Sequence, residues 1–322
     1  MKPKIVVIGS ANTDMIVKVG HLPCPGETVL GDHFIQSRGG KGGNQAVAAA
    51  RLGAEVSFIG RLGRDSFGQN IFEAFEKEGI NTGYILWDDD APTGIALIMI
   101  NKEGENIICV SSGANGKLSE DDIIKSADVI KSADCMLLQL EVPVKTVEFA
   151  IRFASKYHVR VVLNPAPIAR LSKEVMKLVD VLTPNKTEAL ALFGKHEVSP
   201  RELAYSLKMK YALKNVIVTL GKDGAVVSKQ NEPSPIHIAS FPVESVDATG
   251  AGDAFNGGLA VALATGYPLD NAVAYANAVG ALATTRLGAQ SSLPTARQVK
   301  NFLKRITGNI AGIGNVGVCE KR

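Results

Sequence analysis

The chain has 322 residues, of which 46% are hydrophobic and 21% charged, and its formal net charge is +3 at pH 7. Such a chain is long enough to bury a large core, and its composition is typical of a globular protein. The small net charge excludes nucleic acid and anionic membranes as charge-driven partners, and no apolar run approaches the roughly 18–20 residues of a membrane span.

Continuous apolar runs alternate with helical patterns along most of the chain. The runs are typical of strands buried on both faces, and we predict such strands over residues 4–9, 56–60, 135–140, 159–164, 181–184 and 216–220. Helices are predicted over 43–52, 66–78, 119–131, 144–156, 186–193 and 200–211, and then over 251–265, 269–286 and 295–305. This alternation predicts a single α/β domain over residues 1–306, with a doubly wound, mostly parallel, Rossmann-like sheet flanked by helices.

Two stretches interrupt the alternation and have no helix of their own to cover them. Residues 14–34 contain two short apolar runs around a Pro/Gly turn, and residues 93–110 read as a hairpin. We predict that they form one small antiparallel sheet, which serves as a lid on the main domain. The alternative is two surface hairpins without a special role. Residues 307–322 are rich in Gly and Asn, and we expect a flexible tail there.

Two common nucleotide-binding motifs are excluded. Residues 312–317 read GIGNVG, which matches the dinucleotide fingerprint in letters, but no strand is predicted before them and no helix after them. None of the four Gly-Lys pairs is followed by Ser or Thr, so a P-loop is excluded as well. The N-terminus lacks a signal-peptide pattern, and widely spaced cysteines indicate neither zinc nor disulfides (Cys24, Cys109, Cys135 and Cys319). We therefore expect a cytoplasmic protein.

Polar side chains follow several of the predicted strands at their carboxyl ends, where open α/β sheets bind ligands. Each of them alone is more often part of a turn or a helix cap, but several in one sheet predict a binding site. The positions are Asn12 and Asp14 after the first strand, Glu141 after the third, Asn185 with Glu188 at a helix start, and the turn at 221–224.

Two glycine-dense segments precede predicted helices. In RGGKGGNQ (38–45) four glycines cost backbone entropy, so we expect this loop to hold a ligand against its main chain, with Lys41 and Asn44 as donors. The segment DATGAGD (247–253) can present consecutive N–H groups at a helix N-terminus, which attracts anions and charge that develops during a reaction. Asp253 then suits a general base that takes a proton from a hydroxyl. The alternatives are a flexible surface loop and an acid favoured by the helix dipole.

The segments GGKGGNQA (39–46) and DATGAGDAF (247–255) resemble the paired motifs of the ribokinase, or phosphofructokinase-B-type, carbohydrate kinase family. The resemblance extends to about Arg305 and implies a ribokinase-like fold, and segments such as LNPAP (163–167) are most similar to members that phosphorylate ribose. It implies ATP-dependent phosphorylation of D-ribose at O5, with Mg²⁺, activation by a monovalent cation such as K⁺, and a homodimer formed through the lid sheet. The alternatives are a kinase of the same family for deoxyribose, a ketohexose or adenosine, and a sugar-binding sensor without catalysis.

The resemblance also implies roles for individual residues. Asp253 matches the catalytic base, and Gly250, Ala251 and Gly252 match the anion hole. The positions that hold sugar hydroxyls match Asn12, Asp14, Gly40, Lys41, Asn44 and Glu141. The nucleotide and Mg²⁺ positions match Asn185, Glu188, Thr219, Gly221, Gly224, Gly252 and Asn277, and the K⁺ positions match Asp247, Thr249, Ala283, Arg286, Gly288 and Ser292. Gly43 departs from the family, which usually has alanine there, and we expect it to loosen the loop slightly.

Overall fold

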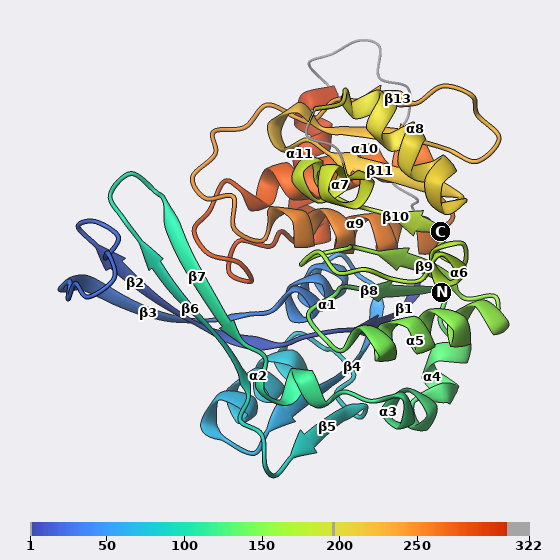
Figure 1. Ribbon diagram of the computed structural model, residues 1–322. Helices are drawn as coiled ribbons and strands as arrows, with labels where there is room; N and C mark the ends of the chain where they lie inside the picture. Colours follow the sequence, from blue (N-terminus) through green and yellow to red (C-terminus); the bar gives the residue numbers. More distant parts are fainter. Residues whose placement is uncertain (1, 195–196, 308–322) are drawn as a thin grey trace.

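The structure is a computed structural model that describes residues 2–194 and 197–307. A large sheet is covered by helices on both faces, and a smaller sheet projects from it (Figure 1). The tail at 308–322, with its GIGNVG segment, lies outside the described residues.

The large sheet has nine strands among the described residues, in the order β13-β12-β11-β10-β9-β8-β1-β4-β5. The pairs from β11 to β5 are parallel, and β12 and β13 are added antiparallel at one edge. The bounds are β1 Lys4–Ile8, β4 Glu55–Gly63, β5 Ile85–Asp88, β8 Cys135–Leu138, β9 Arg160–Leu163, β10 Val181–Leu182, β11 Asn215–Thr219, β12 Ala225–Ser228 and β13 Ile236–Ile238. The predicted doubly wound, mostly parallel sheet is confirmed.

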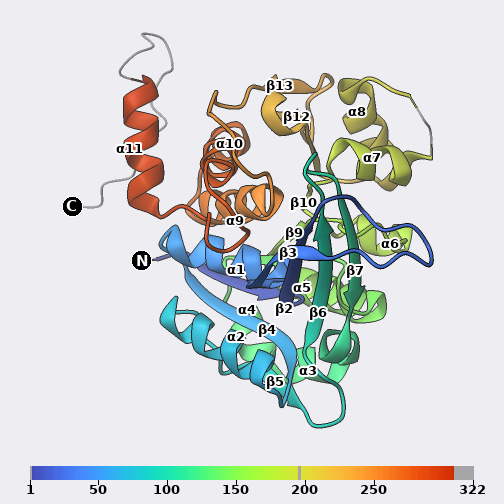
Figure 2. The ribbon, with the colours of Figure 1, turned by 90° about the vertical axis from the view of Figure 1, so that its left-hand side faces the viewer.

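The continuous apolar strands bury side chains in two separate cores. In β1, Ile5 and Val7 contact one helix layer while Val6 and Ile8 contact the other, because successive side chains of a strand point to opposite faces. The first layer contains α1 (Lys41–Arg51), α2 (Ser66–Lys77), α9 (Ala251–Ala264), α10 (Leu269–Ala283) and α11 (Ala296–Thr307), with α11 on the outside next to α10 (Figure 2). The second contains α3 (Glu120–Lys125), α4 (Ala127–Lys131), α5 (Val144–Lys156), α6 (Lys173–Met176), α7 (Lys186–Phe193) and α8 (Pro200–Tyr211).

The helix predicted over 119–131 is wrong in one respect, because the chain breaks it at Ser126. The Ser126 hydroxyl donates to the carbonyl oxygen of Asp122 at 2.9 Å, and the two short helices α3 and α4 meet there. Serine is a weak helix former because its hydroxyl bonds to nearby main-chain groups, which agrees with an irregular turn at Ser126.

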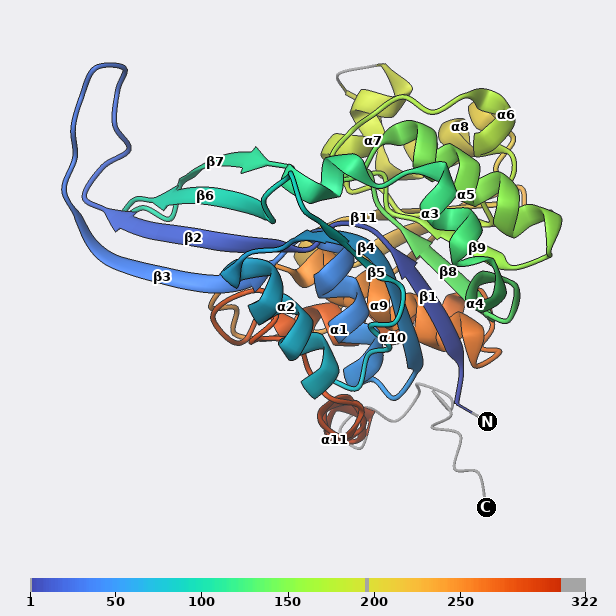
Figure 3. The same cartoon turned by 90° about the horizontal axis from the view of Figure 1, so that it is seen from below.

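The smaller sheet contains β2 (Asn12–Val19), β3 (Gly31–Gly39), β6 (Gly94–Ile100) and β7 (Asn106–Ser111), in the order β3-β2-β6-β7. Its outer pairs are antiparallel, but the central pair β2–β6 is parallel, which corrects the expectation of a wholly antiparallel sheet. The reason lies in the connections. β2 follows β1 and β6 follows β5, and because β1 and β5 run in the same direction in the large sheet, the chain leaves that sheet at the carboxyl ends of its strands both times. The sheet extends away from the main domain (Figure 3).

Candidate active site

The N-terminus of α9 lies at the centre of the site. Gly250 precedes the helix with a φ of 76°, a left-handed conformation that favours glycine, and its neighbour Ala289 would contact any side chain there. Asp253 follows in the first turn and is only 5% exposed. Its carboxylate oxygens accept hydrogen bonds from Asn44 Nδ2 at 2.8 Å and from Gln45 Nε2 at 2.9 Å. Helix α1 therefore fixes the orientation of this acid.

The charges around Asp253 are strongly coupled. Burial raises the pKa of Asp253 above its usual range, and Lys41 together with the two amide donors acts in the opposite direction. Burial disfavours the Lys41 ammonium, but the negative charges of Asp253, Glu141 and Glu188 outweigh it and raise the pKa of Lys41. A buried acid with a raised pKa beside a fixed cation is typical of a general base.

The predicted sugar-binding residues come from three parts of the fold. Asn12 and Asp14 lie in β2 of the smaller sheet, Gly40, Lys41 and Asn44 lie at the start of α1, and Glu141 follows β8. Glu141 Oε2 accepts from the main-chain N–H of Lys41 at 3.0 Å and also contacts the hydroxyl of Ser10 closely. Asn12 lines a pocket of about 440 Å³ together with Glu141. Asp14 is buried beside Gly39, where any side chain would collide with its carboxylate.

The carboxylate of Asp14 also has a raised pKa. Burial and the negative charges of Glu141 and Asp253 raise its pKa to about 7. Because folding raises this pKa, the contribution of Asp14 to the free energy of unfolding is greatest at low pH and decreases as the pH rises through about 7. Near neutral pH the free site thus holds a mixture of both forms of Asp14.

This shift leads to a testable pH dependence of sugar binding. The ionised carboxylate accepts hydrogen bonds from hydroxyls and the protonated form does so less well, so the Kd for sugar should fall about tenfold between pH 6 and pH 8. Isothermal titration calorimetry in two buffers should also detect proton release on binding at pH 6.5. In the Asp14→Asn variant the Kd for sugar should be larger than in the native protein and independent of pH over this range. A Kd of the native protein that does not change with pH would contradict this role of Asp14.

The predicted nucleotide-side residues lie at the ends of β10 and β11. Asn185 and Glu188 form a reciprocal capping box at the start of α7: Asn185 Oδ1 accepts from Glu188 N at 2.8 Å, and Glu188 Oε2 accepts from Asn185 N at 2.9 Å. Burial raises the pKa of Glu188, and the positive charge of Lys41 offsets part of this rise. Lys41 therefore acts electrostatically on both Glu188 and Asp253. Asn185, Thr219 and Gly221 line a common pocket of about 320 Å³.

Two further nucleotide-side residues have structural partners. Gly224 has a φ of 89°, and a side chain there would lie 2.2 Å from the carbonyl oxygen of Ile238. Asn277 is buried, and its Nδ2 donates to the carbonyls of Ile238 at 3.1 Å and Ala239 at 3.2 Å. Gly224 and Asn277 thus both contact the end of β13 at Ile238, and Asn277 also contacts Ala239.

Of the residues predicted to bind K⁺, Thr249 and Gly288 contact Asp247 directly. Its Oδ1 accepts from Thr249 N at 2.9 Å and from Thr249 Oγ1 at 2.6 Å, and its Oδ2 accepts from Gly288 N at 2.8 Å. Burial alone would raise the pKa of Asp247, but these hydrogen bonds outweigh burial and lower it, so the carboxylate stays ionised. Ala283 ends α10 and Ser292 is buried, whereas the side chain of Arg286 is exposed, so only its main-chain carbonyl suits a cation site.

The sequence prediction missed several buried amides of the site. Gln45 holds Asp253, and Asn115 donates from Nδ2 to Asn12 Oδ1 at 2.8 Å and accepts from Ala11 N at 3.0 Å. Gln139, in the buried strand-end segment CMLLQL, donates to Gln45 Oε1. A polar residue inside an apolar run was the one signal available for this network.

Gly43 does not loosen a loop, because it lies inside α1. Its N–H donates to Ser10 O at 2.8 Å, and an added Cβ would lie 3.2 Å from Phe75 Cζ and 3.3 Å from Gln290 Nε2. The predicted start of this helix at residue 43 was two residues late, because the glycine-dense segment itself forms the first turn.

Comparison with known proteins places the chain in a family. Residues 2–296 match the pfkB family of carbohydrate kinases. The chain is 42% identical over 307 residues to the ribokinase of Haemophilus influenzae, and this alignment covers 94% of this chain and 99% of the relative. It is 37% identical over 303 residues to the deoxyribokinase of Salmonella typhi, and that alignment covers 93% of this chain and 98% of the relative. The structure of Arabidopsis thaliana ribokinase complexed with ribose and ATP superimposes with a TM-score of 0.86 at 33% identity and covers 94% of this chain and 99% of that one.

The match thus covers nearly the whole chain in sequence and in fold, and it includes both glycine-dense motifs of the site. Among the described residues, no helix is long and apolar enough to cross a bilayer. The chain belongs to the pfkB family of carbohydrate kinases.

Proposed function

We propose that the protein phosphorylates D-ribose at O5 with ATP, giving D-ribose 5-phosphate and ADP. The observation that carries this proposal is the position of Asp253, a buried acid in the first turn of α9 that Asn44 and Gln45 hold in place at the N-terminus of this helix. A proton acceptor and an anion-stabilising group in one helix turn are what phosphoryl transfer to a hydroxyl requires. The ribokinase relatives support ribose as the acceptor.

In the proposed reaction Asp253 takes the proton of the O5 hydroxyl while O5 attacks the γ-phosphorus of ATP. The N–H groups of Gly250 and Gly252 stabilise the charge on the transferred phosphoryl group, and Lys41 adds a positive charge nearby. The N–H group of Ala251, which the resemblance also assigned to the anion hole, donates instead to the carbonyl oxygen of Ala248 at 3.1 Å. We assign the other sugar hydroxyls to Asn12, Asp14, Gly40, Asn44 and Glu141. Asn44 supports this assignment, because its Oδ1 is buried and has no hydrogen-bond partner among the described residues.

We assign the nucleotide to the pocket that Asn185, Thr219 and Gly221 line, and we assign Gly224 and Asn277 to the adjoining segment around Ile238, which both of them contact. Mg²⁺ supplies charge neutralisation for the phosphates when bound. The described residues offer no group of three or more His, Cys, Asp or Glu that could hold a metal ion directly. The capping box leaves Glu188 Oε1 as an acceptor for a metal-bound water, which fits an ion held mainly by the phosphates.

We assign a monovalent-cation site, with K⁺ as the expected ion, to the loop around Asp247. Its ionised carboxylate and the carbonyls of Thr249, Ala283, Arg286 and Gly288, with the hydroxyl of Ser292, are oxygen donors of the type that such ions bind. A cation there would lie behind the N-terminus of α9, because Ala289 of the same loop packs against Gly250.

We propose that the protein forms a homodimer through the lid sheet. Several large apolar side chains of this sheet are exposed, among them Phe34 at 62% and Ile108 at 53%, and a patch of this kind is typical of a partner surface. Sedimentation equilibrium should give the mass of a dimer, and Phe34→Glu with Ile108→Glu should give a monomer of 34.0 kDa. A native protein that sediments as a monomer would contradict the proposal.

A cytoplasmic location stays a prediction.

A coupled assay of ADP release over a panel of acceptors tests the proposed function. We expect the highest kcat/KM for D-ribose, lower values for deoxyribose and fructose, and little turnover of adenosine or sugar phosphates. A larger kcat/KM for another acceptor would assign a different substrate within the family. Sugar binding without ADP formation would indicate the sensor instead.

A further inference from the structure

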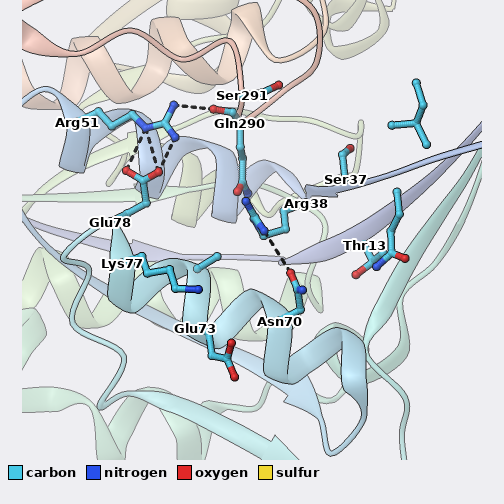
Figure 4. Close-up of a pocket in the computed structure, with 13 residues that line it drawn as sticks. Thr13, Ser37, Arg38, Arg51, Asn70, Glu73, Lys77, Glu78, Gln290 and Ser291 are labelled. Atoms are coloured by element: carbon cyan, nitrogen blue, oxygen red, sulfur yellow. Dashed lines mark hydrogen bonds and ion pairs between the residues drawn. The ribbon is translucent and has the colours of Figure 1, made fainter.

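Arg51 is the last residue of α1, and no sequence motif assigned it a role. Figure 4 shows its side chain at the wall of a pocket of about 790 Å³, between Glu78 and the main chain of Gln290. We infer that Arg51 is a positioning residue that holds the proposed cation loop, residues 286–293, in its binding conformation. This inference rests on the cation site of the proposed function.

All three guanidinium nitrogens of Arg51 are engaged. Nη1 donates to the carbonyl oxygens of Gln290 at 2.7 Å and Leu293 at 3.0 Å. Nε donates to the two carboxylate oxygens of Glu78 at 3.1 and 3.0 Å, and Nη2 contacts Glu78 Oε1 closely. The planar fork of arginine satisfies this arrangement, and the single ammonium of lysine does not.

The two carbonyls that Arg51 holds flank the proposed ligand Ser292. When the carbonyl groups of residues 290 and 293 are both held, the peptide groups between them have fewer orientations available, because only a few soft backbone dihedrals separate the two fixed points. The other end of the loop is held by Asp247, which accepts from Gly288 N. Arg51 and Asp247 therefore fix the loop from its two ends.

The same helix also fixes the proposed base. Asn44 and Gln45 in the first turns of α1 donate to Asp253, and Arg51 at its end donates to the loop. Between these two contacts, Ala289 packs against Gly250 in the proposed anion hole. Helix α1 thus sets the distance between base, anion hole and cation loop.

The hydrogen bonds from Arg51 to the carbonyls of Gln290 and Leu293 should affect the K⁺ affinity more than its ion pair with Glu78 does. The side chains of Arg51 and Glu78 are 23% and 26% exposed, and partly exposed ion pairs contribute little to stability. Glu78 therefore offers a matched control, because Glu78→Gln removes the ion pair and keeps an oxygen that can accept from Arg51, while the bonds to Gln290 and Leu293 remain.

The experiment compares the native enzyme with Arg51→Lys and Glu78→Gln. Initial rates are measured against KCl concentration, with tetramethylammonium chloride keeping the ionic strength constant, and the rise in Tm caused by KCl is measured on the same samples. We expect Arg51→Lys to raise the K⁺ concentration for half-activation at least about tenfold, the factor that corresponds to one lost hydrogen bond to a charged group. The maximal rate should stay within about threefold, and Glu78→Gln should shift half-activation by less than about threefold.

The outcomes separate this inference from the proposed function. A native enzyme whose rate and Tm do not respond to K⁺ overturns the cation site and, with it, the role of Arg51. A K⁺ response that is the same in the native enzyme and in Arg51→Lys overturns the role of Arg51 alone, and so does an equal shift in both variants. If Arg51→Lys does not fold, the double variant Arg51→Gln with Glu78→Gln, which leaves no unpaired charge, should show the same tenfold shift.

Discussion

Replacing Asp253 by asparagine should lower kcat by at least about 10²-fold, the low end of the contribution of a general base. Asparagine keeps the size of the side chain and one oxygen, but it does not accept a proton from the sugar hydroxyl. Ribose binding should persist, because Asn12, Asp14 and Glu141, to which we assign other sugar hydroxyls, are unchanged. The measurement is kcat from the coupled assay together with the Kd for ribose from calorimetry.

The control for this variant is Gln45→Ala, which leaves the acid in place and removes one of its two donors. Turnover should fall by a smaller factor than in Asp253→Asn, because the base is misplaced but present. A near-normal kcat in Asp253→Asn would rule out Asp253 as the base. A loss of ribose binding equal to the loss of turnover would assign it to sugar binding instead.

Replacing Gly252 by alanine should have opposite effects on stability and activity. Gly252 lies in the first turn of α9 with an ordinary helical conformation, and an added Cβ would meet no atom of the described residues within 4 Å. Helix propensity alone then favours alanine, by up to about 1 kcal/mol. The open space is where the transferred phosphoryl group is proposed to lie, and a displacement of about 1 Å there can cost about 10²-fold.

We therefore expect Gly252→Ala to raise Tm slightly while kcat/KM for ATP falls by at least about tenfold. Differential scanning fluorimetry and initial rates over ATP concentration measure the two effects. Gly42→Ala is the contrasting variant: its Cβ would lie 2.7 Å from Ser10 N and Ser10 O, so both stability and activity should fall. If Gly252→Ala is as active as the native enzyme, no ligand approaches the start of α9 closely.

Much of the fold could be predicted because strands buried on both faces have a simple pattern. The run KIVVI predicted β1 to within one residue, since every position of a central parallel strand contacts one of two cores. The strands β5, β12 and β13 were missed, because each has only three or four residues and lies at or next to an edge of the sheet. The parallel pairing of β2 with β6 depends on how distant connections enter the smaller sheet, which local sequence does not encode.

The site could be predicted where glycine marks a main-chain approach or a helix start, as at Gly250 and Gly40. The buried amides Gln45 and Asn115 were missed, because their partners are distant in the chain and each hydrogen bond depends on the packing of α1 or the lid. Arg51 was missed for the same reason. Its partners Gln290 and Leu293 contribute only main-chain oxygens, which leave no trace in the sequence.

A crystal structure of the protein with D-ribose and a non-hydrolysable ATP analogue tests the central claim most directly. The account predicts one carboxylate oxygen of Asp253 within about 2.6–3.2 Å of the ribose O5, and the N–H groups of Gly250 and Gly252 directed at the γ-phosphate. An Asp253 carboxylate directed away from O5, with these N–H groups facing solvent, would contradict it.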